Sequence, residues 1–176
     1  MTQVKRNYYE SGQLQEEYFE INGKKEGVYK RYFENGQLAI IYSYINDKIN
    51  GEYKLYRANG QLKEISSYID NNRNGESKTY YDNGQLEEIC NYINDKQNGE
   101  YKSYHQNGQL EYSIMYVDGE QNGHCKSYYD NGQLRKICLF VDDQINGEIK
   151  EFDVNGNLIQ HYIWYNGRKI EDKMPK

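Results

Sequence analysis

The chain repeats itself every 24 residues without insertion or deletion. A fixed period of this kind is typical of repeat architectures, in which each unit packs against its neighbours. We therefore predict one repeat domain over residues 1–176, with an incomplete unit and a C-terminal tail over 166–176. The seven units are centred on the glycine of an Asn-Gly-Gln-Leu motif and its variants: Gly12, Gly36, Gly60, Gly84, Gly108, Gly132 and Gly156.

Each unit contains two strand-like runs separated by turn residues, for example Glu52 to Arg57 and Gln61 to Ile69. No segment places capped apolar residues at the spacing of a helix face. The repeat therefore predicts an all-β fold: an elongated, twisted single antiparallel sheet of tandem β-hairpins, stacked as a repeat solenoid.

The turn at the Asn-Gly pair sets the register of each hairpin. Asn131-Gly132 favours a two-residue type I′ turn, because Asn and Gly tolerate positive φ best, and this turn places Cys125 opposite Cys138. The alternative is a three-residue loop with a glycine bulge, which would place Cys125 opposite Ile137. We favour the first.

The alternative loop would also pair Tyr56 with Leu62. At the other junction, over residues 45–51, we expect a longer polar loop whose Asn and Asp side chains hydrogen-bond their own backbone.

The composition limits what can form a core. The hydrophobic fraction of 36% includes 21 tyrosines, so tyrosine replaces aliphatic residues as the material available for burial. We interpret two aromatic columns as packing within the sheet rather than as a stacking platform for a ligand. They are Tyr8, Tyr32, Tyr56, Tyr80, Tyr104, Tyr128 and Phe152, and Tyr44, Tyr68, Tyr92, Tyr116, Phe140 and Trp164.

Cys90, Cys125 and Cys138 are too few and too irregularly spaced for a disulfide framework. We expect reduced thiols in a cytoplasmic protein, or in the host cytoplasm for a viral chain. No apolar run is long enough for a membrane span or a signal peptide. We find no spacing of a metal site, nucleophile motif or phosphate loop, and predict no enzyme activity and no cofactor.

One charged column recurs in every unit, and acids stand two residues before several of its members on the same face. Glu52, Glu76, Glu100 and Glu148 should therefore pair with it and cancel the field that would attract phosphates. We expect no nucleic-acid partner. The basic column is Lys30, Lys54, Lys78, Lys102, Lys126 and Lys150, preceded by Arg6.

Variation between units is concentrated at two other positions, where we expect any specificity to lie. The first contains Arg31, Leu55, Thr79, Ser103, Ser127 and Glu151. The second contains Ile40, Glu64, Glu88, Tyr112, Lys136 and Gln160.

The stretch Ile21-Asn22-Gly23-Lys24-Lys25-Glu26-Gly27, continued by Tyr32 and Asn35-Gly36-Gln37-Leu38, resembles the MORN-repeat variant. This pattern recurs over nearly the whole chain, and it is similar to repeats found in bacterial antitoxins of the YwqK type. The resemblance implies an elongated sheet of β-hairpins.

We hypothesise a protein-binding or scaffolding protein whose partner is another protein, with homodimerisation through a sheet edge or face. One alternative is an antitoxin-like or immunity-like protein that neutralises a toxin. The other is a peripheral phospholipid-binding MORN protein that uses the basic column.

Overall fold

The computed structural model describes residues 1–173 and contains β-strands and turns, with no helix in that range. The strands fall into two compact units. Unit 1 comprises Met1–Gly84 and Tyr92–Asp95, and unit 2 comprises Gln85–Asn91 and the residues from Lys96 onward. The predicted C-terminal tail begins with the turn residues Asn166 and Gly167, a strand follows them, and the last three residues, 174–176, lie outside the described range.

The strands of unit 1 are β1 (Thr2–Tyr8), β2 (Leu14–Ile21), β3 (Lys24–Tyr32), β4 (Leu38–Ile45), β5 (Lys48–Tyr56), β6 (Leu62–Ile69) and β7 (Asn72–Tyr80). Strand β8 (Leu86–Ile93) has residues in both units. The strands of unit 2 are β9 (Lys96–Gln97), β10 (Gly99–Tyr104), β11 (Leu110–Val117), β12 (Glu120–Gln121), β13 (Gly123–Tyr128), β14 (Leu134–Val141), β15 (Gln144–Ile145), β16 (Gly147–Phe152), β17 (Leu158–Tyr165) and β18 (Arg168–Asp172).

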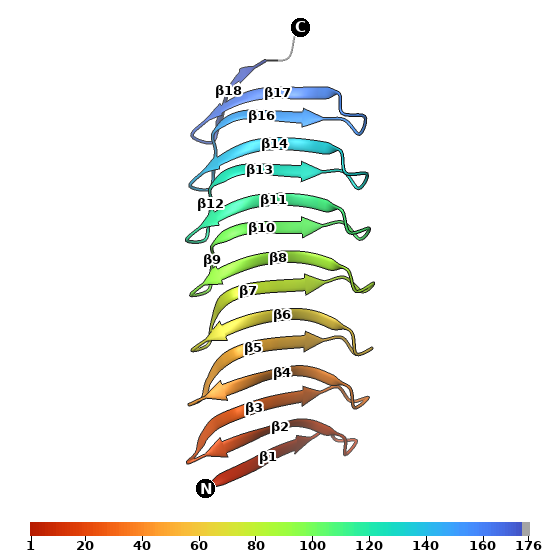
Figure 1. The fold of residues 1–176 in the computed structure, drawn as a ribbon, viewed down its shortest axis with the longest axis vertical. Coiled ribbons are helices and arrows are strands. Elements are labelled where there is room, and N and C mark those ends of the chain that lie inside the picture. Colours follow the sequence, from red (N-terminus) through yellow and green to blue (C-terminus); the bar gives the residue numbers. More distant parts are fainter. Residues whose placement is uncertain (174–176) are drawn as a thin grey trace. The chain divides into compact units, whose positions relative to one another are not determined.

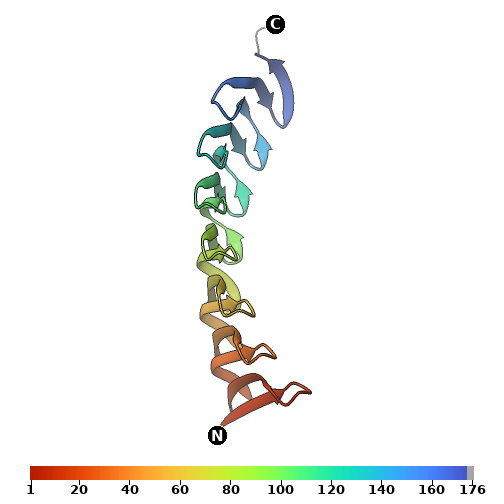
Figure 2. The same ribbon diagram turned by 90° about the vertical axis from the view of Figure 1, so that its right-hand side faces the viewer.

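Successive strands pair antiparallel within each unit, as Figure 1 shows. In unit 1 the pairing runs without interruption from β1 to β7. In unit 2 it runs through the long strands β10, β11, β13, β14, β16 and β17 to β18. Figure 2 shows a single layer of strands in each unit. The prediction of an all-β fold of tandem antiparallel hairpins is confirmed.

The Asn-Gly connection is a three-residue loop with a glycine bulge, so the prediction of a type I′ turn is wrong. The amide of Gly60 donates to the carbonyl of Arg57 at 2.8 Å, and the amide of Arg57 donates to the carbonyl of Gln61 at 2.8 Å. Gly60 has φ of 86°, whereas Asn59 has no positive φ. The reason is the Asn59 side chain, whose Oδ1 accepts a hydrogen bond from the amide of Gln61 at 3.0 Å and closes an Asx turn.

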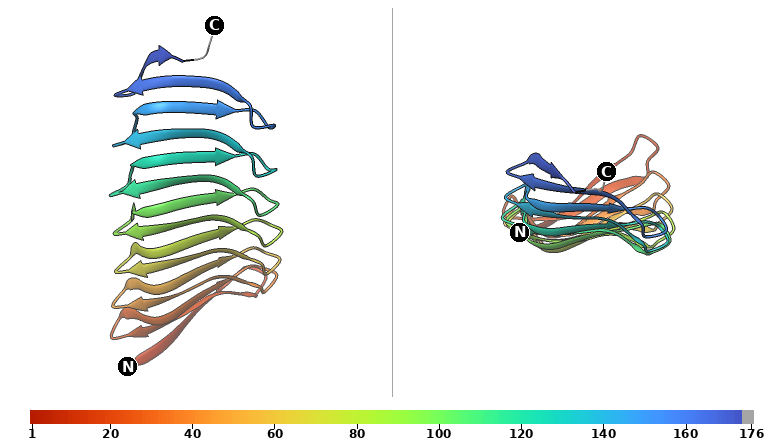
Figure 3. Two further views of the ribbon diagram at one scale, coloured as in Figure 1. Left: turned by 45° about the horizontal axis from the view of Figure 1, so that its top comes forward. Right: turned by 90° about the horizontal axis from the view of Figure 1, so that it is seen from above.

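The type I′ turn forms at the other connection instead. Asn46 and Asp47 have φ of 49° and 65°, and Ile45 pairs with Lys48 around them. The predicted long polar loop over residues 45–51 is therefore wrong, because Asn and Asp also tolerate positive φ. In each unit the two kinds of connection lie at opposite edges of the sheet (Figures 1 and 3).

Away from the loop the predicted register is correct despite the different turn, whereas next to the loop Tyr56 pairs with Leu62, as the alternative loop predicts. Cys125 lies opposite Cys138, and the alternative pairing with Ile137 does not occur. Next to the loop, Tyr128 pairs with Leu134 and Ser127 pairs with Lys136, so one residue of β14 is bulged out between them. This second bulge compensates for the extra loop residue and returns the pairing to the register of a two-residue turn.

A disulfide joins Cys125 of β13 to Cys138 of β14 with a Cα–Cα distance of 5.2 Å. The expectation of two reduced thiols is therefore wrong. The register is the reason, because it places the two side chains directly opposite each other at a separation that a disulfide can span. Cys90 is a buried free thiol.

Hydrogen bonds between equivalent turns connect each repeat to the next. The side-chain amide of Asn35 donates to the carbonyl of Ala58 at 2.8 Å, one repeat further along. At the opposite edge, Oδ1 of Asp47 accepts from the amide of Lys25 at 2.7 Å, and the amide of Asp47 donates to the carbonyl of Lys25 at 3.0 Å. The sequence predicts that polar turn side chains bond their own backbone. In the structure, Asn35 and Asp47 also bond a neighbouring repeat.

Asn35 and Asn59 offer a matched test of the bond between repeats. Asn59 uses its side-chain amide within its own turn, on Oε1 of Gln61, whereas Asn35 reaches the next repeat. Each asparagine also accepts a hydrogen bond from the amide two residues later, and each substitution removes that bond, worth about 1 kcal/mol. Asn35→Ala in addition removes the bond to the backbone of the next repeat, so we expect it to lower the free energy of unfolding by about 2 kcal/mol in all. For Asn59→Ala we expect a loss of only about 1 kcal/mol, because the entropy cost of ordering the exposed Gln61 side chain offsets its second bond. Urea denaturation measures both values. Equal losses would show that the bond between repeats adds no stability.

The disulfide predicts a simple thiol count. Denatured, unreduced protein should expose one reactive thiol, from Cys90, and reduced protein should expose three. The double variant Cys125→Ala/Cys138→Ala should lose up to about 3 kcal/mol of stability, because the unfolded chain is no longer cross-linked. Cys90→Ala is the control: reductant should lower its stability by the same amount as it lowers the stability of the wild type. Three thiols before reduction would contradict the disulfide.

Candidate interaction surface

The sheet of each of the two compact units has two chemically different faces. Consecutive side chains of a strand point to opposite faces, and directly paired residues point to the same face. Lys54 and Leu55 are neighbours on β5, so the basic column and the variable positions lie on opposite faces. We call them the lysine face, which carries the basic column, and the variable face, which carries Leu55 and its counterparts.

Within each unit the two sets of variable residues form one row across the strands, because members of one set pair with members of the other. We call this row the variable ladder. In unit 1 it consists of Glu16, Arg31, Ile40, Leu55, Glu64 and Thr79. In unit 2 it consists of Glu88, Ser103, Tyr112, Ser127, Lys136, Glu151 and Gln160. All six residues of the first predicted set therefore lie on this ladder.

A second row beside the variable ladder supplies most of the buried side chains, and we call it the core ladder. In unit 1 it begins with stacked tyrosines: the ring centroids of Tyr29 and Tyr42 are 4.7 Å apart, and those of Tyr42 and Tyr53 are 5.7 Å apart. Tyr44, from a predicted packing column, meets both Tyr29 and Tyr42 edge-on. The packing interpretation of that column is confirmed there.

The core ladder changes its chemistry along the chain. Ser66 and Ser77 are buried and share a hydrogen bond of 2.8 Å. In unit 2 the ladder becomes the hydrophobic cluster of Ile114, Ile149 and the disulfide-bonded cysteines. The repeat pattern does not reveal this row, because its residue type changes from repeat to repeat. The paired register of Cys125 and Cys138 was the one signal that could have located it.

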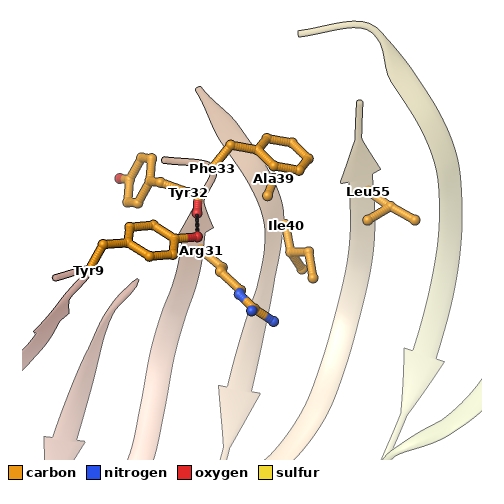
Figure 4. A pocket seen from close by; sticks show the side chains of 7 residues that line it. All are labelled: Tyr9, Arg31, Tyr32, Phe33, Ala39, Ile40 and Leu55. Carbon is orange, nitrogen blue, oxygen red and sulfur yellow. Dashed lines mark hydrogen bonds between the residues drawn. The ribbon is translucent and has the colours of Figure 1, made fainter. Parts of the chain in front are cut away.

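A shallow groove of about 250 Å³ opens on the variable face of unit 1. Leu55, Ile40, Phe33 and the small buried Ala39 form its apolar lining (Figure 4). Its remaining lining residues are Arg31, Tyr32 and Tyr9.

The Tyr9 hydroxyl anchors one side of this groove by donating to the carbonyl of Tyr32 at 2.7 Å (Figure 4). Tyr129 occupies the equivalent position in a later repeat and makes the same bond. Its hydroxyl donates to the carbonyl of Phe152, in the next repeat, at 2.9 Å. These side chains therefore hold neighbouring repeats together as well as lining a groove.

Arg31 lies at the unit 1 groove beside Glu16, yet the two do not form an ion pair. Both carboxylate oxygens of Glu16 accept other hydrogen bonds, one from the Tyr29 hydroxyl at 2.5 Å and one from the Asn7 amide at 2.6 Å. The bond from Tyr29 is the main reason that the pKa of Glu16 lies below its usual value. The guanidinium of Arg31 is exposed and makes no hydrogen bond or ion pair with the described residues.

A groove of about 230 Å³ occupies the equivalent place in unit 2, four repeats later, with a different lining. Ser127 replaces Arg31, Glu151 replaces Leu55, and Arg135 replaces Ala39. Nζ of Lys136 pairs with Glu151 at 3.0 Å, and the guanidinium of Arg135 lies 5.7 Å from the centre of the Tyr129 ring. The charges of this groove are therefore satisfied within it.

The lysine face carries the predicted ion pairs. Lys54 pairs with Glu52 at 2.5 Å, Lys102 with Glu100 at 2.8 Å and Lys150 with Glu148 at 2.6 Å. Lys78 pairs with Glu76 in the same way. Hydrogen bonding to the paired acid raises the pKa of Lys54, Lys78 and Lys102. Lys30 lacks an acid two residues before it and instead lies 3.7 Å from Glu17.

No helix among residues 1–173 has the length and apolar character needed to cross a membrane. In the same part of the chain, no three His, Cys, Asp or Glu side chains are grouped so that they could hold a metal ion.

Comparison with known proteins identifies the repeat. The family model described as the MORN repeat variant matches residues 4–19, 25–46, 49–70, 73–94, 97–118 and 121–142. No curated protein matches the sequence.

Similar solved structures include a GtfA/B complex bound to UDP and GlcNAc, at 14% identity and a TM-score of 0.22 over 78% of this chain and 24% of that one. A TcdB2-TccC3 structure is 12% identical, with a TM-score of 0.29 over 97% of this chain and 14% of that one. A TcdB2-TccC3-Cdc42 structure is also 12% identical, with a TM-score of 0.21 over 95% and 13%. The chain thus spans less than a quarter of each of these proteins.

The core ladder predicts alkaline sensitivity. Burial raises the pKa of Tyr29, Tyr42, Tyr53 and Tyr101 above the ordinary value of 10.0. Above that pH the unfolded chain releases protons that the folded protein retains, so stability is complete below about pH 10 and falls as the pH rises further. Tyrosinate absorbance followed together with circular dichroism should show these rings ionising only as the protein unfolds. Ionisation of all tyrosines near pH 10 in a folded protein would contradict this.

Proposed function

The chain belongs to the MORN-repeat-variant family, and from this premise we propose that it is a non-enzymatic protein that binds another protein through the variable face. A repeat protein of this kind is suited to binding or scaffolding, because stacked units present a continuous surface. The proposal extends this general role to one face and to one class of partner.

The observation that carries the proposal is the variable ladder. Its residues include acids, bases, hydroxyls, an aromatic ring and aliphatic side chains, all on one face and in one uninterrupted row within each unit. The turns and ion pairs around it repeat with little change. A row that varies within a constant framework is what specific recognition of a protein surface requires, since specificity comes from complementary contacts at defined positions.

The lysine face supports phospholipid binding less well. Four of its lysines are paired with acids two residues away, and each pair cancels the charge that would attract an anionic headgroup. A toxin, as in the antitoxin-like alternative, would be one kind of protein partner for the variable face. Identifying the partner therefore distinguishes a scaffold from an antitoxin.

Affinity capture from the native cell, read by mass spectrometry, tests the proposal with matched variants. Leu55→Gln and Tyr112→Gln change the variable ladder in units 1 and 2. Lys54→Gln and Ser113→Gln change the preceding or following residue, on the opposite face. We expect a partner that the wild type and the lysine-face variants retain and that at least one ladder variant loses, by about tenfold or more for a loss of about 1.4 kcal/mol.

Circular dichroism of all four variants controls for loss of folding. If a partner binds both ladder variants but does not bind Lys54→Gln or Ser113→Gln, the binding site lies on the lysine face instead. Binding to anionic vesicles that Lys54→Gln weakens would favour the phospholipid alternative instead.

A further inference from the structure

The unit 1 groove combines an apolar lining with a cation, Arg31, whose guanidinium makes no hydrogen bond or ion pair within the described part of the chain. Its volume of about 250 Å³ is below the range of pockets that enclose whole small-molecule ligands, and it is open to solvent. A groove of this size accommodates one large side chain of a partner. Phe33, Ile40 and Leu55 offer apolar contacts to such a side chain from three neighbouring segments (Figure 4).

The unpaired guanidinium of Arg31 specifies the charge of that partner. An arginine presents a rigid fork of donors that matches a carboxylate in a bidentate arrangement. Glu16, the acid nearest to it in the register, has both oxygens engaged by Tyr29 and Asn7. The donors of Arg31 therefore remain available, although the charge of Glu16 lies nearby.

We propose that the unit 1 groove binds a segment of a partner protein in which a large apolar side chain stands next to an aspartate or glutamate. The apolar side chain occupies the groove between Phe33, Ile40 and Leu55, and the carboxylate accepts hydrogen bonds from Arg31. This inference rests on the proposed function, because it names the chemistry that one part of the variable ladder recognises.

The unit 2 groove shows why the proposal applies to unit 1. Lys136 and Glu151 neutralise each other there, and Arg135 lies over a ring where unit 1 has the small Ala39. Ser127 stands where Arg31 stands in unit 1 and provides no cation. The same backbone thus forms two different grooves. In the unit 2 groove Lys136 and Glu151 pair with each other, whereas in the unit 1 groove the exposed guanidinium of Arg31 lies beside an apolar lining.

Selection from a displayed library of random ten-residue peptides tests the proposal on the full chain. We expect the enriched peptides to share a Phe, Leu, Ile or Trp adjacent to Asp or Glu. A synthetic peptide with this motif should bind Arg31→Gln about tenfold or more weakly than the wild type, as expected for loss of a charge-assisted hydrogen bond. Ser127→Gln, the matched change in the unit 2 groove, should leave the affinity unchanged.

A double-mutant cycle separates the direct contact from a general effect of charge. Replacing the peptide's carboxylate by its amide should weaken binding to the wild type but change binding to Arg31→Gln little, because the two groups act as a pair. Thermal unfolding of each variant controls for folding.

Several results would overturn the proposal: no enriched peptide, an enriched motif without an acid, or full affinity for Arg31→Gln. If peptides bind but only Tyr112→Gln weakens them, the groove proposal fails and the proposed function of the variable face stands. If neither the peptides nor the native partner depends on any ladder residue, the proposed function fails as well.

Discussion

The register between neighbouring strands is the constraint on which the rest of this structure depends. A shift of one residue would move every side chain to the opposite face, and it would exchange the core ladder for the lysine column. Two irregularities of opposite effect hold the register: the extra residue of the Asn-Gly loop and the bulge that follows it in the next strand. Because the hairpins β3–β4, β5–β6, β10–β11, β13–β14 and β16–β17 contain the same register shift next to the loop, their register is the same.

A constant register allows the residue types on one row to change freely. The core ladder contains stacked tyrosines in unit 1 and a disulfide flanked by isoleucines in unit 2, yet the strand pairing is the same. Neighbouring repeats are held by backbone pairing and by turn side chains such as Asn35 and Asp47, which do not contribute to either face. The variable ladder can therefore differ between two equivalent grooves without a change of fold, and this is what makes one groove apolar with a free guanidinium and the other internally paired.

The sequence predicts the fold class and the placement of the candidate surface, and it fails at the turns. The period and the alternating runs indicate antiparallel hairpins, and the pairing of Lys54 with Glu52 follows from strand alternation alone. The choice between turn types could not be made from local preference, because Asn-Gly suits both a type I′ turn and a glycine bulge loop. The outcome depends on the side chain of Asn59 and on contacts with adjacent repeats. The grooves also escape prediction, since they require Ala39 and Leu55, which lie on different strands, to be close in space.

By itself the sequence determined the repeat, the antiparallel hairpins and the separation of lysines from variable residues, since each follows from spacing along the chain. The tertiary structure decided which row is buried and that the bulge in β14 brings Cys125 opposite Cys138, where the two are joined. It also decided that Arg31 makes no hydrogen bond or ion pair with residues 1–173. Those properties depend on which side chains of different strands compete for the same hydrogen-bond acceptor or the same space. Glu16 could have paired with Arg31, but Tyr29 and Asn7 occupy its oxygens first.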